Sequence, residues 1–205
     1  MAKAKNAGGR PREHRVDLSI AEAVLQVVGE AGYAGLTVDA VAARAGVSKA
    51  AIYRRYSTKQ EMTFAVLLHD TEEQPPADTG TLHGDLVALT EQIAAQLAGS
   101  GADTLSGLLA DIRAEPELRD RFATGYLSVE RGIITTVLER ARARGELARR
   151  PDPVIVQSLL LGPLFAWLIV LDEDAAQLAE LVRLIATSAA DALIAGRVPA
   201  DIGAR

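Results

Sequence analysis

The chain has 205 residues, 49% of them hydrophobic, which suits one large domain or a small domain joined to a larger one. It has no cysteine, and its three histidines (His14, His69 and His83) lack metal-ligand spacing, so we expect no disulfide, no metal and no cofactor. The net charge of −5 is uneven: residues 1–60 hold ten Lys and Arg against five acids, and the remainder holds twelve against twenty-two. This asymmetry predicts that the N-terminal end meets a polyanion.

The whole chain is predicted to be helical, because apolar residues recur at intervals of three and four and no stretch alternates with period two. A first helix has an apolar face around Val24 and ends at Gly32, which suits a left-handed cap. Thr37 is placed to cap a second helix that runs through Ala45, and Gly46 permits a sharp turn after it. The N-terminal part therefore begins with two helices and a glycine turn.

Two further helices follow the turn. Ser48 is placed to cap a third helix from Lys49 to about Tyr56. Thr58 and Glu61 have the spacing of a capping box, so a fourth helix begins there and continues to roughly residue 73.

A segment rich in proline and glycine, residues 75–81, breaks the helical pattern and is predicted to connect this N-terminal unit to a larger body. Pro116 falls in the first turn of a long helix of that body. The helices expected in the body, which bring the total to nine, cover residues 82–97, 105–112, 116–144, 154–171 and 175–194.

One segment is apolar enough to suggest a membrane span. Residues 154–171 carry no charge and are just long enough to cross a bilayer. Gln157, Ser158, Gly162 and Pro163 interrupt the segment, and no companion span exists. A helix that is apolar on all sides also occurs in large cores and interfaces, and we favour that interpretation. The basic N-terminus precedes no apolar region with a cleavage site, so we expect a cytoplasmic protein without membrane contact.

The order helix, glycine turn, helix is typical of the helix-turn-helix of DNA-binding proteins. Ala42 is small where the two helices must approach, and Gly46 lies four residues later. The third helix combines small residues, which let its backbone approach a groove, with cations and hydroxyls that reach phosphates or base edges. A lysine beside the free amides that open the fourth helix favours phosphate binding. The residues expected to contact double-stranded DNA are Thr37, Ser48, Lys49, Ala50, Ala51, Tyr53, Arg54, Arg55 and Lys59.

These features also have purely structural interpretations. Tyr53 and Tyr56 are both candidates for core aromatics, and Tyr56 is favoured because it lies one turn after Ile52. Seen alone, Arg54 and Arg55 would form a solvated face. A helix-turn-helix also occurs in proteins that bind no DNA. The combination of turn spacing, local basicity and an acidic remainder favours DNA binding.

Residues 37–62, TVDAVAARAGVSKAAIYRRYSTKQEM, resemble the DNA-binding signature of the TetR/AcrR family. In that signature a threonine opens the second helix, an AGVS turn follows, and a lysine opens the fourth helix. The resemblance covers about residues 15–65. It departs at Arg55, where histidine is frequent, and at Tyr56, where phenylalanine is usual.

The resemblance implies a homodimer whose last two helices form a four-helix interface, and a ligand pocket that changes the separation of the two DNA-reading heads. Residues 154–171 and 175–194 match those dimer helices in order and character. Two segments, LRDRFATGYLSVERGIITTVLERARARGEL and LLLGPLFAWLI, also resemble the body of an actinobacterial-type branch of the family. We therefore expect an all-α fold in which helix 4 joins a three-helix head to a helical body. Its expected parts are a basic flexible arm (1–16), a helix-turn-helix DNA-binding domain (17–65) and a ligand-binding and dimerisation domain (66–205).

The expected function is a ligand-responsive transcriptional regulator, in the first instance a repressor that binds a palindromic operator as a homodimer. An activator and an architectural DNA-binding protein without a ligand response are the alternatives. An enzyme is not expected, because the carboxylates of DIRAEPELRDR lie on amphipathic helices as solvated faces would. The effector is expected to be a small molecule of unidentified chemistry. The body residues that could line its pocket are Arg113, Phe122, Tyr126, Gln157, Ser158, Phe165 and Trp167.

Overall fold

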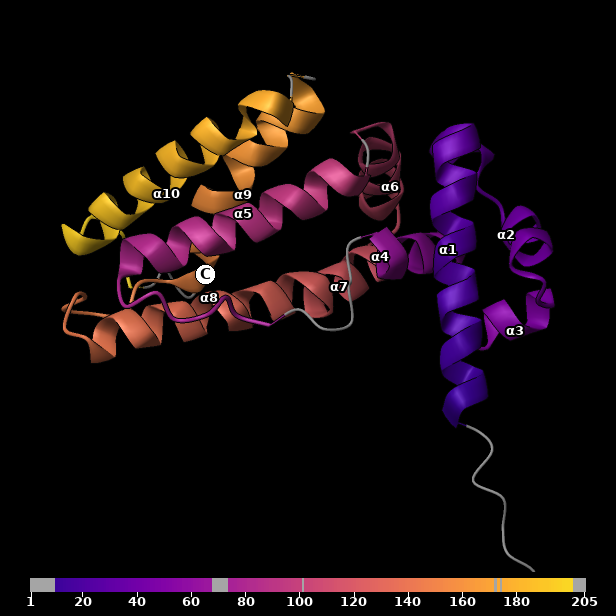
Figure 1. The fold of residues 1–205 in the computed structure, drawn as a ribbon, viewed down its shortest axis with the longest axis horizontal. Coiled ribbons are helices and arrows are strands. Elements are labelled where there is room, and N and C mark those ends of the chain that lie inside the picture. The colour runs from indigo at the N-terminus through magenta and orange to yellow at the C-terminus, as the bar shows by residue number, and fades with distance from the viewer. Residues whose placement is uncertain (1–9, 68–73, 101, 172, 174, 201–205) are drawn as a thin grey trace, which may run out of the picture.

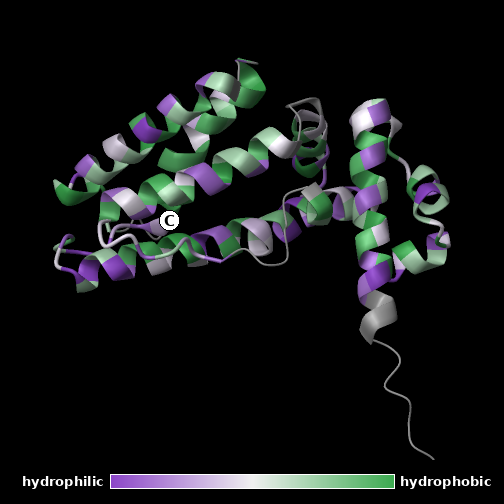
Figure 2. Ribbon diagram, in the orientation of Figure 1, coloured by the Kyte–Doolittle hydropathy of each residue, from purple (hydrophilic) through white to green (hydrophobic). Residues whose placement is uncertain are grey.

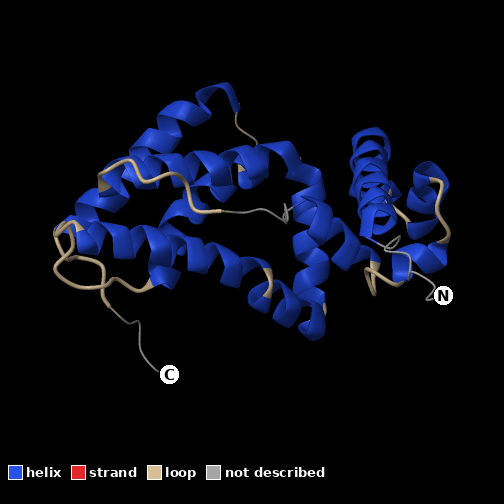
Figure 3. Ribbon diagram, turned by 60° about the horizontal axis from the view of Figure 1, so that its bottom comes forward, coloured by secondary structure: helices blue, strands red, loops and turns tan. Residues whose placement is uncertain are grey.

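The computed structural model describes residues 10–67, 74–100, 102–171, 173 and 175–200, and every regular element in these ranges is a helix (Figure 3). The helices form a small head at one end of the molecule and a larger body at the other (Figure 1). The predicted all-α class is thereby confirmed. The head contains α1 (Arg10–Gly35), α2 (Val38–Ala45) and α3 (Lys49–Tyr53), and α4 (Lys59–Leu67) leads from the head into the body.

The three helices of the head share a small apolar core. Ile20 and Val24 of α1, Val41 of α2 and Ile52 of α3 are each at most 1% exposed and belong to one cluster. Burial of four aliphatic side chains contributes about 1.5–3 kcal/mol each, which is what holds two short helices against α1. Helices as short as α2 and α3 would not form alone.

Both ends of α1 bear on the predictions. Gly32 leaves the helical conformation (φ 65°, ψ −176°), so the regular helix ends there as predicted. The helix begins at Arg10, so residues 10–16, which the sequence analysis assigned to the arm, are helical. A proline at position 11 fits the first turn, where its missing N–H has no partner to lose. The rest of the arm, residues 1–9, lies outside the described residues.

Helix α4 begins with the predicted capping interaction. The Thr58 hydroxyl oxygen accepts from the Glu61 N–H at 3.0 Å, and the Glu61 carboxylate accepts from the Ser57 N–H at 2.7 Å. Met62 and Thr63 are completely buried, so α4 is enclosed by neighbours from both parts of the molecule. The described part of the helix ends at Leu67, and the predicted extension to residue 73 lies outside the described residues.

The next four helices of the body are α5 (Leu82–Ser100), α6 (Ala102–Ala114), α7 (Pro116–Thr124) and α8 (Tyr126–Ala143). The single helix predicted over residues 116–144 is corrected here, because it is divided at Gly125 (φ −83°, ψ −94°). A Cβ atom at this position would lie 2.9 Å from the carbonyl oxygen of Arg121. Glycine alone therefore fits the break.

The last elements are α9 (Pro153–Phe165), the π-helical η1 (Ala166–Val170), the 3₁₀ turn η2 (Ala175–Gln177) and α10 (Leu178–Ile194). Figure 2 shows the hydrophobic character of α9. The 18 residues from Pro153 to Val170 are long and apolar enough to cross a membrane by length and composition, but only 22% of them are buried within the chain. Most of this apolar segment is therefore not buried by other parts of the same chain.

A charged cluster fastens the connecting segment to the end of α8. Arg144 donates to Asp78 at 2.8 Å, to Asp85 at 2.9 Å and to Glu146 at 2.7 Å. Asp85 is completely buried and also accepts from the N–H and the hydroxyl of Thr79, at 2.8 and 2.7 Å. Although burial raises the pKa of Asp85, these hydrogen bonds and the Arg144 charge lower it by more. The ionised carboxylate therefore holds the chain between head and body in place.

Candidate nucleic-acid interface

The turn between α2 and α3 has the geometry that its sequence predicts. Gly46 adopts the left-handed conformation (φ 65°, ψ 30°), and its N–H donates to the carbonyl of Ala42. The Thr37 hydroxyl accepts from the Ala40 N–H at 3.1 Å and so caps α2. The Ser48 hydroxyl accepts from the Ala51 N–H at 3.2 Å and caps α3. Two side-chain caps and one glycine thus fix the angle between the helices.

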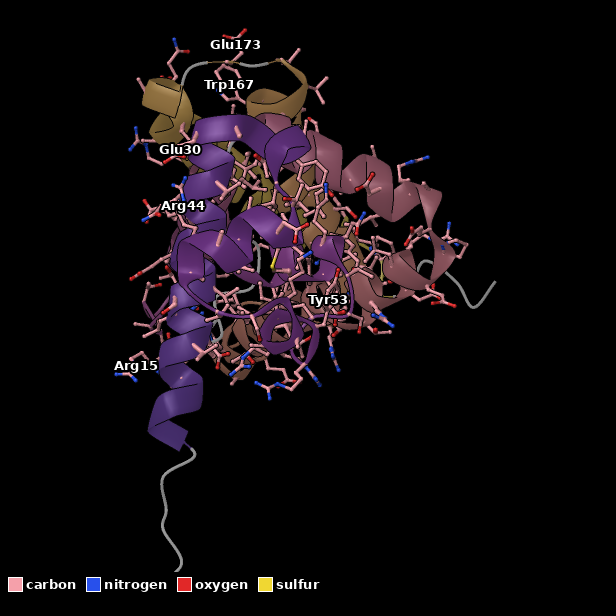
Figure 4. The ribbon with its side chains drawn as sticks, turned by 90° about the vertical axis from the view of Figure 1, so that its right-hand side faces the viewer. Arg15, Glu30, Arg44, Tyr53, Trp167 and Glu173 are labelled. Carbon is pink, nitrogen blue, oxygen red and sulfur yellow. The ribbon has the colours of Figure 1, made fainter. Side chains whose placement is uncertain are left out.

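Helix α3 buries one residue and exposes the opposite face. Ile52 is 1% exposed and anchors the helix, whereas Lys49, Ala50 and Arg54 are exposed, and Tyr53 is 55% exposed. Ala51 is half-buried. Figure 4 shows Tyr53 on the end of the molecule formed by the head. The exposed face thus offers a cation and a phenol beside small residues, a combination that can enter a major groove.

Exposed ion pairs connect the helices around this face. Lys49 forms an ion pair with Asp39 in the first turn of α2, and both side chains are largely exposed. Arg44 and Glu30 form a pair with two hydrogen bonds of 2.6 Å that joins α2 to α1 (Figure 4). The hydrogen bond from Arg44 lowers the pKa of Glu30. Exposed pairs of this kind contribute little to stability, so a DNA phosphate can replace Asp39 as the partner of Lys49.

Arg55 differs from the other predicted contacts. Its guanidinium forms an ion pair with Asp17 of α1 and donates to the Ala51 carbonyl at 3.1 Å, and its side chain is only 18% exposed. In the described structure this cation fastens the end of α3 to α1, and its predicted phosphate contact stays a prediction. The partner lies 38 residues away in the sequence, and no local pattern points to it.

Tyr56 and Lys59 also lie partly inside the head. Burial raises the pKa of Tyr56, which supports the interpretation of this residue as a core aromatic. Lys59 opens α4 and is half-buried, and its ammonium nitrogen lies 4.1 Å from the centre of the Tyr33 ring. Sequence reasoning assigned no role to Tyr33, and only its position directly after Gly32 could have pointed to it.

The structure connects three of the residues predicted to line an effector pocket. The rings of Phe122 and Tyr126 stack with centroids 5.7 Å apart, and Phe64 from α4 meets Phe122 edge-on at 5.1 Å. The Tyr126 hydroxyl donates to Glu130 at 3.1 Å, and the Gln157 amide donates to the same buried carboxylate at 2.7 Å. Phe64 and Glu130 were missed, because Phe64 on α4 and Gln157 on α9 reach this part of α8 from distant helices.

The other four predicted pocket residues lie on α6, α9 and η1. Arg113 is exposed near the end of α6, and Ser158 is exposed with its hydroxyl donating to the Val154 carbonyl at 2.9 Å. Phe165 ends α9, and Trp167 lies in η1, half-buried against the core. Figure 4 shows Trp167 far from the Tyr53 face.

Two of the grooves in the described part of the molecule border features already given. One, of about 370 Å³, lies between head and body, and Phe64, Leu118 and Phe122 are among its lining residues. The other, of about 310 Å³, lies between α9 and α10 and is almost wholly apolar, with Leu159 and Leu184 among its lining residues. The first groove borders the aromatic cluster, and the second borders the exposed face of α9.

Two family models match the chain, one over each part. The model described as bacterial regulatory proteins, tetR family, matches residues 20–66, which form most of the head. The model described as tetracyclin repressor-like, C-terminal domain, matches residues 76–193, which form most of the body.

Individual relatives agree with the family models. An uncharacterized HTH-type transcriptional regulator of Mycobacterium tuberculosis is 35% identical over 125 residues, which cover 60% of this chain and 61% of the relative. The HTH-type transcriptional regulator AqdR of Rhodococcus erythropolis is 30% identical over 164 residues, 78% of this chain and 75% of AqdR. The match thus spans about three fifths of the mycobacterial regulator and three quarters of AqdR.

The fold also agrees with a solved structure. A TetR transcription regulator from Haloarcula marismortui superimposes with a TM-score of 0.60 at 22% identity, covering 88% of this chain and 98% of that one. The chain therefore belongs to the TetR family of transcriptional regulators, which are not enzymes but bind DNA through an N-terminal helix-turn-helix and act as dimers.

Proposed function

We propose that the protein is a homodimeric repressor whose two α3 helices enter successive major grooves of a palindromic operator, about 34 Å apart. The observation that carries this proposal is the exposed face of α3, with Lys49, Ala50, Tyr53 and Arg54 presented around the buried anchor Ile52. Lys59 adds a phosphate contact at the start of α4. The backbones of Thr37 and Ser48 lie at the edge of the DNA major groove. The protein acts in the cytoplasm, where such an operator lies.

The proposed dimer forms through α9 and α10. Val154 and Leu159 of α9 and Leu184 and Ile194 of α10 are between 39% and 63% exposed, which is unusual for large aliphatic side chains. The apolar groove between the two helices supplies a surface into which the same helices of a second chain would pack. A four-helix interface would cover these residues and the exposed part of the Pro153–Val170 segment.

The proposed effector binds beside the aromatic cluster of Phe64, Phe122 and Tyr126. The groove of about 370 Å³ at this place lies between head and body, so an occupant there would contact both. Its lining favours a largely apolar small molecule. Effector binding would favour a state in which the two heads have the wrong spacing for the operator, and the difference in effector affinity between the two states sets the size of the response.

Footprinting tests the DNA-binding part of the proposal. The purified protein is incubated with the promoter region upstream of its own gene and with those of the neighbouring genes. We expect protection of an inverted repeat whose half-sites lie one helical turn apart, and lower transcription from a reporter that carries it. If the protein retains none of the fragments in a salt-sensitive manner, DNA binding is contradicted. If reporter transcription increases, the protein is an activator.

A second measurement tests the effector. Small molecules that bind the protein, found by their effect on its melting temperature, are added to the protected fragment. We expect some of them to release the DNA. If every binder leaves DNA affinity unchanged, the protein is a regulator without a ligand response.

A further inference from the structure

Helices α1, α4 and α6 meet at the carboxylate of Asp111. This residue lies on α6 of the body, and its Oδ2 atom accepts two hydrogen bonds from the head. The Tyr33 hydroxyl donates to it at 2.7 Å, and the Gln60 side-chain amide donates to it at 2.9 Å. Tyr33 belongs to the turn that ends α1, and Gln60 is the second residue of α4. One oxygen atom of the body thus holds two elements of the head.

The Tyr33 ring has two close neighbours in addition to the partner of its hydroxyl. On one side lies Gly107 of α6, where an added Cβ would come within 2.4 Å of the ring carbon Cδ1. The missing side chain at residue 107 is therefore what lets the ring lie against α6. Above the ring lies the Lys59 ammonium, 4.1 Å from its centre, a distance at which cation and ring attract each other. Tyr33 is only 9% exposed, so its side chain has little room to move.

The charges in this cluster support one another. The hydrogen bond from Tyr33 is the largest influence that lowers the pKa of Asp111, and the Gln60 bond and the Lys59 charge lower it further. Burial and the Asp111 carboxylate raise the pKa of Tyr33. At neutral pH the cluster therefore consists of a carboxylate, a neutral phenol and an ammonium group in contact.

We propose that Tyr33, fixed by Asp111, is a positioning residue for DNA binding: it holds the Lys59 ammonium where that group meets a DNA phosphate. This inference rests on the proposed function, because it assumes that Lys59 contacts phosphate. It goes beyond that function by assigning the body a direct effect on a phosphate contact. A movement of α6 relative to the head carries Asp111 with it, shifts the Tyr33 ring and releases Lys59, so phosphate binding depends on the state of the body.

A double-mutant cycle tests the inference with a fluorescently labelled duplex of the upstream promoter region. Dissociation constants are measured over a series of salt concentrations for the wild type, Tyr33→Phe, Lys59→Gln and the double variant. Lys59→Gln removes one phosphate contact from each subunit of the dimer, and should reduce the slope of log K against log salt by about 0.9 per subunit, or about 1.8 for the dimer. Tyr33→Phe keeps the ring but loses the bond to Asp111, and should weaken binding about threefold to tenfold. In the Lys59→Gln background the same change should alter binding less than about twofold, because the group that it positions is absent.

The controls separate positioning from general damage. Tyr56→Phe, the matched control, removes one phenolic hydroxyl from the same head without touching the bond to Asp111, and should leave DNA affinity unchanged. Asp111→Asn repeats the cycle from the body side and should show the same dependence on Lys59. Circular dichroism and melting curves establish that each variant is folded.

Each outcome has a definite meaning. The inference is overturned if Tyr33→Phe binds DNA like the wild type or more tightly. It is also overturned if Tyr33→Phe costs as much affinity in the Lys59→Gln background as it does when Lys59 is present. An unchanged salt slope in Lys59→Gln likewise overturns it but leaves the regulator intact. If the wild type binds no duplex, the proposed function itself fails.

Discussion

Lys49 and Lys59 are both cations of the head, but their surroundings predict different contributions to DNA binding. Lys49 is exposed on α3 and its ion pair with Asp39 is exposed to solvent, so exchanging that partner for a base edge costs little. Lys59 is half-buried, and its ammonium nitrogen lies 4.1 Å from the centre of the Tyr33 ring. Arg55, with the same formal charge, is occupied by Asp17. The surroundings of a cation, and not its charge alone, thus predict whether it reads the DNA base sequence or adds affinity through a phosphate.

The first prediction concerns Lys49. Lys49→Ala should change the order of preference among operator variants, with a loss of about tenfold on the preferred sequence, because a base contact is worth about 1–3 kcal/mol of discrimination. Binding assays on a set of operator variants with single base changes provide the measurement. Relative affinities that stay the same across the set would place the reading residue elsewhere.

The second prediction concerns Asp85 and pH. A carboxylate with a lowered folded pKa stabilises the fold fully above the ordinary aspartate value of about 3.9, and this contribution disappears as the pH falls through the folded pKa. Asp85→Asn should therefore lower the free energy of unfolding at neutral pH by about 1–3 kcal/mol and flatten its fall in acid. Urea denaturation over a pH series measures both effects. Thr79→Val, which removes one donor to Asp85, should give a smaller loss in the same pH window.

At the level of elements, α3 is the shortest helix with a proposed DNA contact, and it is held by its ends. It was expected to reach about Tyr56 but ends at Tyr53, and the Arg55 N–H then bonds to the Ile52 carbonyl three residues back, at 2.8 Å, which tightens the last turn. Five residues have no helical stability of their own in water. The orientation of α3 therefore depends on the Ser48 cap, the Ile52 anchor and the turn at Gly46.

The third prediction tests that turn. Gly46→Ala places a side chain in the left-handed conformation and should destabilise the protein by about 1–2 kcal/mol and weaken operator binding, because α3 must shift to relieve the strain. Gly132→Ala is the matched control: this glycine lies within α8, and an added Cβ meets nothing within 4 Å. The control should raise stability by about 0.5–1 kcal/mol and leave DNA binding unchanged. Equal effects of the two substitutions would contradict the role of the turn.

On the scale of the whole molecule, α6 is the element through which the body reaches the head. It contacts α1 and α4 on the head side, and α5, α7 and η1 on the body side. The π-helical η1 continues α9 directly, so α6 lies between the proposed dimer helix and the proposed phosphate contact. A shift in the packing of either neighbour has a physical route to the other through Asp111.

The fourth prediction tests the proposed dimer. Leu184 is 63% exposed and lines the α9–α10 groove, so Leu184→Glu would bury an unpaired carboxylate on each side of a twofold interface. The dimer should dissociate, and operator affinity should fall with it. Sedimentation analysis measures the association state. Leu25→Glu, at a residue of α1 that is 50% exposed, should leave the dimer intact; an intact dimer in Leu184→Glu as well would exclude this interface.

Features that depend on residues close together were predictable from the sequence alone. The helical periodicity, the caps at Thr37 and Ser48 and the glycine turn each involve groups within four residues of one another, so local chemistry fixes them before any tertiary contact forms. The family signature adds to this reasoning because it lies within the same continuous stretch. The all-α class and the head with its helix-turn-helix followed from these features.

Only the tertiary structure decided which charged and aromatic side chains meet. Arg55 finds Asp17 across 38 residues, and Tyr33 finds Asp111 across 78. A periodic pattern shows which face of a helix is apolar, but it does not show which distant helix will pack there or which polar group that helix will bring. Partner choice among many similar carboxylates depends on packing geometry, because an ion pair or hydrogen bond forms only when its atoms are held within about 3 Å.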